Sequence, residues 1–98
     1  MADLQLTSAA FADLAEIDEY GVAAFGEEAA EAYSRGLKRV FDMLERYPLS
    51  APARPDYGDG IRCRVYREHL VLHTAASDVV LIVRVLHHSR DVKQALQE

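Results

Sequence analysis

The 98-residue chain contains a single cysteine, Cys63, so it cannot form an internal disulfide bond. Small domains without disulfides are typical of a reducing compartment, and we expect this protein to act in the cytoplasm. The longest uninterrupted run of branched or leucine residues, at positions 79–83, is far shorter than the roughly 20 residues that cross a bilayer. The first residues show no basic segment followed by an apolar one. We therefore expect neither a membrane span nor a secretion signal.

The signatures of nucleophilic and phosphate-binding enzymes are also missing. No serine lies in a Gly-x-Ser-x-Gly elbow, and no glycine-rich loop that would cradle a phosphate is present. Cys63 alternates with Arg62 and Arg64, which is typical of a small buried residue rather than a nucleophile. We therefore expect no catalytic residue.

The four histidines do not follow the spacing of a metal site. His69 and His73 lie four residues apart, which in a strand separates two side chains by about 13 Å. His87 and His88 are adjacent and would point to opposite sides of a continuing strand. A zinc site needs three or four convergent ligands, and this pattern does not supply them. We therefore expect no metal and no cofactor.

The charge of the chain is divided between its halves. Residues 1–34 carry eight acidic residues and no lysine or arginine, whereas residues 35–98 carry eleven basic residues against eight acidic ones. The basic half could face a nucleic acid, an acidic protein segment or no partner at all. Tight nonspecific binding to DNA depends on neutralising phosphates, so the net charge of −5 disfavours it.

The apolar spacing predicts two amphipathic helices. In the first, which Thr7 or Ser8 would cap, apolar residues recur at intervals of three and four up to about residue 25, and Asp13 lies off their stripe. Gly26 breaks the pattern, and a second, longer stripe continues to about residue 47. A glycine inside this second helix, Gly36, suggests that another backbone passes close to it. Together the two helices predict an αα-hairpin.

Strands are predicted before and after this hairpin. Residues 3–6 form a short first strand, and residues 61–66, 69–74 and 79–86 form three more, of which the last is the most apolar and therefore central. Residues 92–98 predict a short exposed helix, so we expect the core to be complete without them. The predicted fold class is α+β: an αα-hairpin packed on a mostly antiparallel sheet of three to four strands, within one domain spanning residues 1–98.

Several polar side chains on these strands are candidates for binding. The predicted sheet face with Arg62, Arg64, Tyr66 and His73 could hold RNA by stacking and charge, or it could be an ordinary solvated surface. Arg84 lies in an apolar run, so its guanidinium either reaches the open face or pairs with a carboxylate or a backbone carbonyl. The target-binding or structural candidates are Arg62, Arg64, Tyr66, Arg84, His87 and Arg90.

Three motifs carry a family resemblance: Gly60-Ile61-Arg62, Tyr66-Arg67-Glu68-His69 and Arg84-Val85-Leu86-His87-His88-Ser89-Arg90-Asp91. With the order of predicted elements, they resemble the ParE branch of the ParE/RelE toxin superfamily over almost the whole chain. The resemblance implies a type II toxin with a ParD-like antitoxin encoded nearby. It further implies growth arrest through protein–protein inhibition of DNA gyrase, without enzyme activity or sequence-specific nucleic-acid binding.

Two other functions fit the same resemblance. The first is a ribosome-dependent mRNA endoribonuclease of the RelE type, and the second is a degenerate member that binds an antitoxin and poisons nothing. The ribonuclease branch commonly uses basic residues with a tyrosine near the C-terminus. Here the last tyrosine is Tyr66, and His73 stands where many relatives have a tyrosine. These departures favour the inhibitor over the ribonuclease.

Overall fold

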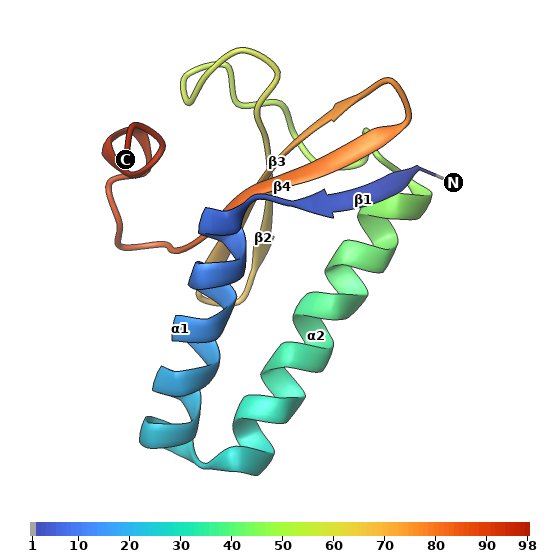
Figure 1. The fold of residues 1–98 in the computed structure, drawn as a ribbon. Helices are drawn as coiled ribbons and strands as arrows, with labels where there is room; N and C mark the ends of the chain where they lie inside the picture. Colours follow the sequence, from blue (N-terminus) through green and yellow to red (C-terminus); the bar gives the residue numbers. More distant parts are fainter. Residues whose placement is uncertain (1) are drawn as a thin grey trace.

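The structure is a computed structural model that describes residues 2–98, and it confirms the predicted α+β class. Figure 1 shows the N-terminal strand, the helical hairpin, the sheet and a short last helix, with the start of the N-terminal strand and the last helix on opposite sides of the molecule. Within the described residues, no helix is both long enough and apolar enough to span a membrane. The elements are β1 (Asp3–Leu6), α1 (Ser8–Phe25), α2 (Glu27–Arg46), β2 (Arg62–Tyr66), β3 (His69–Ala76), β4 (Val79–His87) and α3 (Val92–Ala95).

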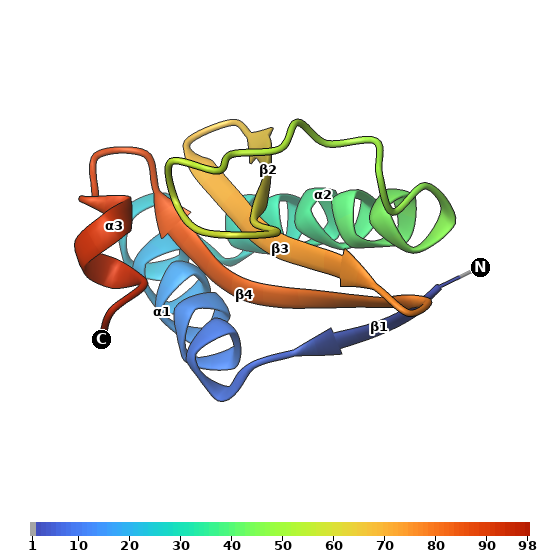
Figure 2. The same cartoon turned by 90° about the horizontal axis from the view of Figure 1, so that it is seen from above.

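The sheet has the strand order β1-β4-β3-β2, and Figure 2 shows β1 at one edge and β2 at the other. β1 runs parallel to β4, whereas β4 with β3 and β3 with β2 are antiparallel pairs. Two-residue turns join the antiparallel strands, and Arg67, Ser77 and Asp78 adopt the positive φ angles that such turns require. β4 is therefore an internal strand, as its apolar composition predicts.

The two long helices begin and end where the sequence predicts. The Thr7 side chain accepts a hydrogen bond from the Ala10 amide at 3.0 Å and so caps α1. Gly26, with a φ of 93°, ends α1 and directly precedes α2. The helices meet at this glycine and diverge toward the sheet (Figure 1). Their divergence leaves room for side chains from the sheet between them.

Both faces of the sheet are covered. The helices bury the larger core on one face, where Leu37, Leu44, Val71 and Ile82 are almost fully inaccessible. On the other face, a second core contains buried residues of the sheet and of α3, with side chains of the loop before β2 packed against it. Its buried members are Cys63, Leu72, Leu86, Val92 and Ala95.

The second core corrects the prediction that the C-terminal helix is an exposed addition. Val92 and Ala95 are only 6% and 1% exposed, because they pack against the sheet face that the helical hairpin does not reach. A sheet with one uncovered apolar face would leave that face in water. The short α3 helix therefore belongs to the fold.

β4 extends beyond β1, and residues at the beginning of α1 form hydrogen bonds with the backbone groups of β4 that β1 does not reach. β1 pairs with β4 only as far as Leu6 and Ile82. The Thr7 amide then donates to the Ile82 carbonyl at 3.0 Å, and the Thr7 hydroxyl donates to the Val83 carbonyl at 2.7 Å. Polar groups at the start of the helix thus satisfy backbone groups that a longer β1 would have paired.

The Asp13 carboxylate continues this edge and pairs with Arg84. It accepts hydrogen bonds from Arg84 Nε at 2.7 Å, from Arg84 Nη2 at 2.8 Å and from the Val85 amide at 3.0 Å. Arg84 Nη1 also donates to the Ala95 carbonyl at 2.9 Å, so one guanidinium joins α1, β4 and α3. Hydrogen bonding to Asp13 raises the pKa of Arg84. This geometry confirms pairing with both a carboxylate and a backbone carbonyl, and it buries Asp13, which the sequence places off the apolar stripe.

Replacing either partner of this pair should strongly destabilise the fold. The Arg84 and Asp13 side chains are 12% and 8% exposed, and removing one partner from a buried pair typically costs about 3 to 5 kcal/mol. We expect Arg84→Ala and Asp13→Ala each to lower the free energy of unfolding by this amount in denaturant melts. Arg54→Ala, which removes an exposed pair with Asp56, is the control and should change stability little. Equal effects of Arg54→Ala and Arg84→Ala would contradict this role.

A chain that ends after Asp91 should be less stable than the full chain. The truncation exposes the Leu86 side of the sheet and removes the Ala95 carbonyl that Arg84 uses. Loss of the buried Val92 side chain alone should cost about 2 kcal/mol. A chain that ends after Leu96 keeps α3 and serves as the control in thermal melts. Unchanged melting of the shorter chain would restore the original expectation of a core that is complete without α3.

Candidate functional site

A cleft of about 900 Å³ opens between the helical hairpin and one end of the sheet. One wall comes from α1 and α2, and the opposite side comes from the β2–β3 turn and the end of β4. We refer to this space as the cleft. Its size is that of a typical binding site for a ligand or for several side chains of a partner.

The helical wall of the cleft carries large exposed aromatic residues. Tyr20 and Phe25 are 68% and 70% exposed, and their rings meet edge to face with centroids 6.2 Å apart. Ile17 and Ala30 continue the apolar surface deeper between the helices. Exposed apolar side chains that gather at a concave surface are typical of a protein–protein contact.

A row of aromatic rings runs from α2 across β2 and β3 to the end of β4. The Tyr66, Tyr33 and His69 rings meet edge to face at centroid distances of 5.1 and 5.4 Å. His69 meets His87 at 5.5 Å, and His87 stacks on His88 at 4.4 Å. We call these five residues the ring ladder. It connects α2 to the exposed end of β4.

Tyr33 and His69 form a short hydrogen bond within the ring ladder. The Tyr33 hydroxyl lies 2.6 Å from His69 Nδ1. Burial raises the pKa of Tyr33, whereas burial and the neighbouring His87 lower the pKa of His69. At neutral pH both shifts favour a protonated tyrosine and a neutral imidazole, and the hydroxyl donates a hydrogen bond to Nδ1 when the imidazole proton is on Nε2. The pair orients both rings toward the cleft.

Charged residues of both signs surround the apolar part of the cleft. Arg39 of α2, Arg67 of the β2–β3 turn and Arg90 after β4 lie at its border, and Glu16 and Asp18 line the α1 side. This distribution suits a partner segment that has an apolar face flanked by charges.

The structure brings three of the six predicted site residues to the cleft. These are Tyr66 of the ring ladder, His87 at the end of β4, and Arg90. The Arg90 guanidinium donates from Nη2 to Glu98 Oε1 at 3.4 Å. Arg84 serves the buried pair with Asp13.

The other two predicted residues, Arg62 and Arg64, turn toward the loop that follows α2. Arg62 Nη1 donates to the Ala51 carbonyl at 2.7 Å, and Arg64 Nη2 donates to the Ser50 hydroxyl at 3.1 Å. His73 is completely buried, and this burial lowers its pKa. The expected face of Arg62, Arg64, Tyr66 and His73 is therefore not one open surface, because α2 and the loop that follows it cover much of that side of the sheet.

Sequence reasoning missed most residues of the cleft. Tyr20, Tyr33 and Phe25 are not among the predicted site residues, although a large aromatic residue off the apolar stripe of a helix, such as Tyr20, can indicate a binding surface. Glu68 and His69 occupy the β2–β3 turn and the strand that follows it, and their role depends on what this turn faces. No local pattern contains that information.

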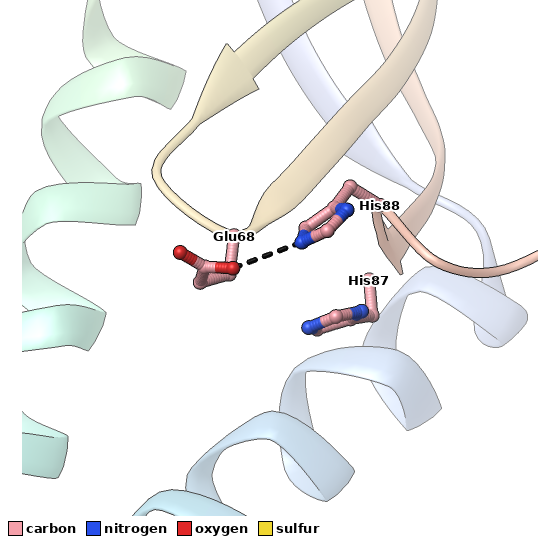
Figure 3. Close-up of side chains that lie close together, drawn as sticks. All are labelled: Glu68, His87 and His88. Atoms are coloured by element: carbon pink, nitrogen blue, oxygen red, sulfur yellow. Dashed lines mark hydrogen bonds and ion pairs between the residues drawn. The ribbon is translucent and has the colours of Figure 1, made fainter.

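Glu68, His87 and His88 form an exposed group of side chains of the kinds that can bind a metal, at the border of the cleft that Glu68 and His87 line (Figure 3). One donor atom from each lies within 4.8 Å of the others, and His88 Nε2 is 2.9 Å from Glu68 Oε2. The two histidines stack instead of pointing to opposite sides, because β4 ends at His87 and the chain turns there. This placement differs from the expectation that the histidines do not converge.

Comparison with known proteins agrees with this architecture. Residues 4–92 match the family model of the ParE toxin of the type II toxin–antitoxin system parDE. The match covers most of the chain, which therefore belongs to the ParE toxin family. It is a ParE-type toxin of a type II toxin–antitoxin system. No curated protein sequence matches the chain.

Two solved structures resemble this one in fold. The chromosomal ParDE system from P. aeruginosa is similar with a TM-score of 0.77 and 21% identity, over 89% of this chain and 96% of that one. The toxin–antitoxin complex RelBE2 from Mycobacterium tuberculosis is similar with a TM-score of 0.58 and 24% identity, over 91% of this chain and 93% of that one.

Gly36 and Tyr66 should be energetically coupled, because the Tyr66 ring lies against the Gly36 backbone and would overlap a Cβ atom there. The predicted close neighbour of this glycine is thus a side chain and not a backbone. In the wild-type background, Gly36→Ala should destabilise the protein by displacing the ring. In a Tyr66→Ala background, the same change should stabilise it by up to about 1 kcal/mol through helix propensity. Urea denaturation of the four variants measures this change of sign, and a Gly36→Ala effect of the same sign in both backgrounds would refute the coupling.

Proposed function

We propose that this toxin arrests growth by binding DNA gyrase through protein–protein contact, and that its antitoxin neutralises it by occupying the cleft. The observation that carries the proposal is the use of the strand arginines. The Arg84 guanidinium donates to Asp13 and to the Ala95 carbonyl, and the Arg62 guanidinium donates to the carbonyls of Leu49 and Ala51, so both side chains stabilise the fold. A site that cleaves RNA needs such groups free to contact a phosphate.

The exposed surface also supports a protein partner. The aromatic wall with Tyr20 and Phe25 offers apolar area at a concave site, which an amphipathic helix can cover. Aromatic residues are enriched in the centres of protein interfaces, where they contribute much of the binding energy. The antitoxin is therefore proposed to place the apolar face of a helix against this wall.

The free edge of β2 offers a second contact for the antitoxin. The loop before β2 covers only the beginning of this edge, where the Cys63 amide donates to the Pro52 carbonyl at 3.0 Å. Val65 is 63% exposed further along the same strand. An extended segment of the antitoxin can pair with the strand at Val65 and lengthen the sheet.

One observation favours the competing function, cleavage of mRNA on the ribosome. The hydrogen-bonded Tyr33 and His69 lie in the cleft near Arg67 and Arg90. A histidine whose pKa is lowered can act as a general base on a 2′-hydroxyl, and an arginine can stabilise the phosphate. We rank this function second because Tyr33 and His69 are hydrogen-bonded to each other instead of facing an open acceptor.

Expression of the toxin alone should arrest growth, and co-expression of its antitoxin should restore growth. Purified toxin should inhibit supercoiling by gyrase and leave mRNA on programmed ribosomes intact. Intact supercoiling together with cleaved mRNA, abolished by His69→Gln, would replace the proposal by the ribonuclease function. No effect in any of these assays would identify a member without toxicity.

The cleft variant Phe25→Ala tests where the antitoxin binds. Losing an aromatic contact that is buried in the complex should weaken binding at least about fivefold in calorimetry, since such contacts contribute about 1 kcal/mol or more. Phe11→Ala is a matched control, because Phe11 is 62% exposed on the same helix and does not line the cleft. Equal losses for both variants would place the antitoxin elsewhere on α1.

A further inference from the structure

The exposed end of the ring ladder has the composition of a metal site. Glu68 lies in the β2–β3 turn, and His87 and His88 lie where β4 ends, so two separate segments supply the three side chains (Figure 3). Donor atoms that share one zinc ion at about 2.0 to 2.1 Å lie roughly 3.3 Å apart in tetrahedral geometry. The present separations, 2.9 Å between Glu68 and His88 and at most 4.8 Å within the group, need only small side-chain rotations.

We propose that Glu68, His87 and His88 bind a divalent transition-metal ion, with Zn²⁺ as the best match. Two imidazoles and one carboxylate are ligands that zinc accepts readily. Mg²⁺ and Ca²⁺ prefer oxygen ligands and would not compete effectively. The protein supplies three ligands, and water completes the coordination. The proposal does not depend on the target of the toxin.

The backbone holds the two ligand segments in a fixed relation. The His88 amide donates to the Glu68 carbonyl at 2.9 Å, directly beyond the last paired residues of the sheet, His69 and His87. The intervening turn is tight, with Arg67 at a φ of 49°. The ligands therefore attach to a hydrogen-bonded hairpin end and not to a mobile loop, so little order is lost when a metal binds.

Neighbouring groups can also orient the ligand rings. The Ser89 hydroxyl lies 2.7 Å from His87 Nδ1. The Ser89 amide also donates to His87 Nδ1, at 3.1 Å. Binding a metal through Nε2 places the ring proton on Nδ1, which then donates to the Ser89 hydroxyl in place of accepting from the amide, the usual arrangement of a ligating histidine. The His69 ring packs edge-on against His87 and limits its rotation.

The hydrogen bond between His88 and Glu68 is another role that these two side chains can have. Their contact is 2.9 Å, and the side chains are 55% and 65% exposed. An exposed pair of this kind contributes little to stability, so it offers little resistance to a metal that binds both groups. The third group, His87, faces the same space without taking part in this pair.

Titration of Zn²⁺ into the tag-free protein tests the proposal. We expect one ion per chain in calorimetry and no response to Mg²⁺. His88→Ala and Glu68→Gln should each weaken Zn²⁺ binding at least tenfold, whereas Glu28→Gln, which removes an exposed acid on α2, should leave it unchanged. All three substituted residues are exposed, so the variants should melt like the wild type.

Imidazole nitrogen spectra give an independent readout. On addition of Zn²⁺, the His87 and His88 signals should shift, and the buried His73 serves as an internal control that should not. Absence of saturable binding would overturn the proposal. Binding that survives His88→Ala or Glu68→Gln at full strength would also overturn it, because the ion would then lie elsewhere.

Discussion

The fold depends on the way the edge of β4 is completed beyond β1. β1 ends at Leu6. Beyond it, the Asp13 carboxylate accepts a hydrogen bond from the Val85 amide and also pairs with Arg84. Arg84 in turn holds the Ala95 carbonyl, so one buried pair connects the first helix, the internal strand and the last helix. Burying an isolated charge is costly, which forces these three elements to remain together once Arg84 is buried.

This junction also determines the position of the cleft. Because the beginning of α1 is bound to β4, the chain returns from the turn at Gly26 with α2 packed across the sheet. Gly36 provides the space in which the Tyr66 ring fits, and Tyr33 of the same helix then reaches His69. The cleft is the space left between this packed end and the exposed turn at Gly26. Its shape thus follows from packing constraints that lie mostly outside its own walls.

The exposed aromatic surface is consistent with a protein that works in complexes. The exposed apolar surface of Tyr20 and Phe25 does not contribute to the stability of the isolated chain. A partner that buries this surface gains binding free energy from it. The histidines at the opposite border add a chemically different feature, which a metal ion can use without contacting the aromatic wall.

Local sequence patterns were sufficient for the order of elements, the helix cap at Thr7, the break at Gly26 and the internal position of β4. These features depend on neighbours within a few residues, so periodicity and turn residues report them directly. The motifs were likewise sufficient for the ParE family. Tyr66 was a site candidate as part of a predicted sheet face, and His87 and Arg90 were candidates because polar residues gather at the end of the last strand. The sequence did not show that these three residues share a cleft.

Only the tertiary structure decided which polar residues are buried and which histidines meet. Asp13 and Arg84 are 71 positions apart in the sequence. Helical periodicity predicts that Asp13 is exposed to solvent, because it contains no information about a partner so far away in the chain. The burial of Val92 and Ala95 depends on a sheet face formed by other strands, and the approach of Glu68 to His88 depends on strand register and on the end of β4. Sequence periodicity reports whether one face of an element is buried, whereas the identity of the group it meets is set by the packing of the whole chain.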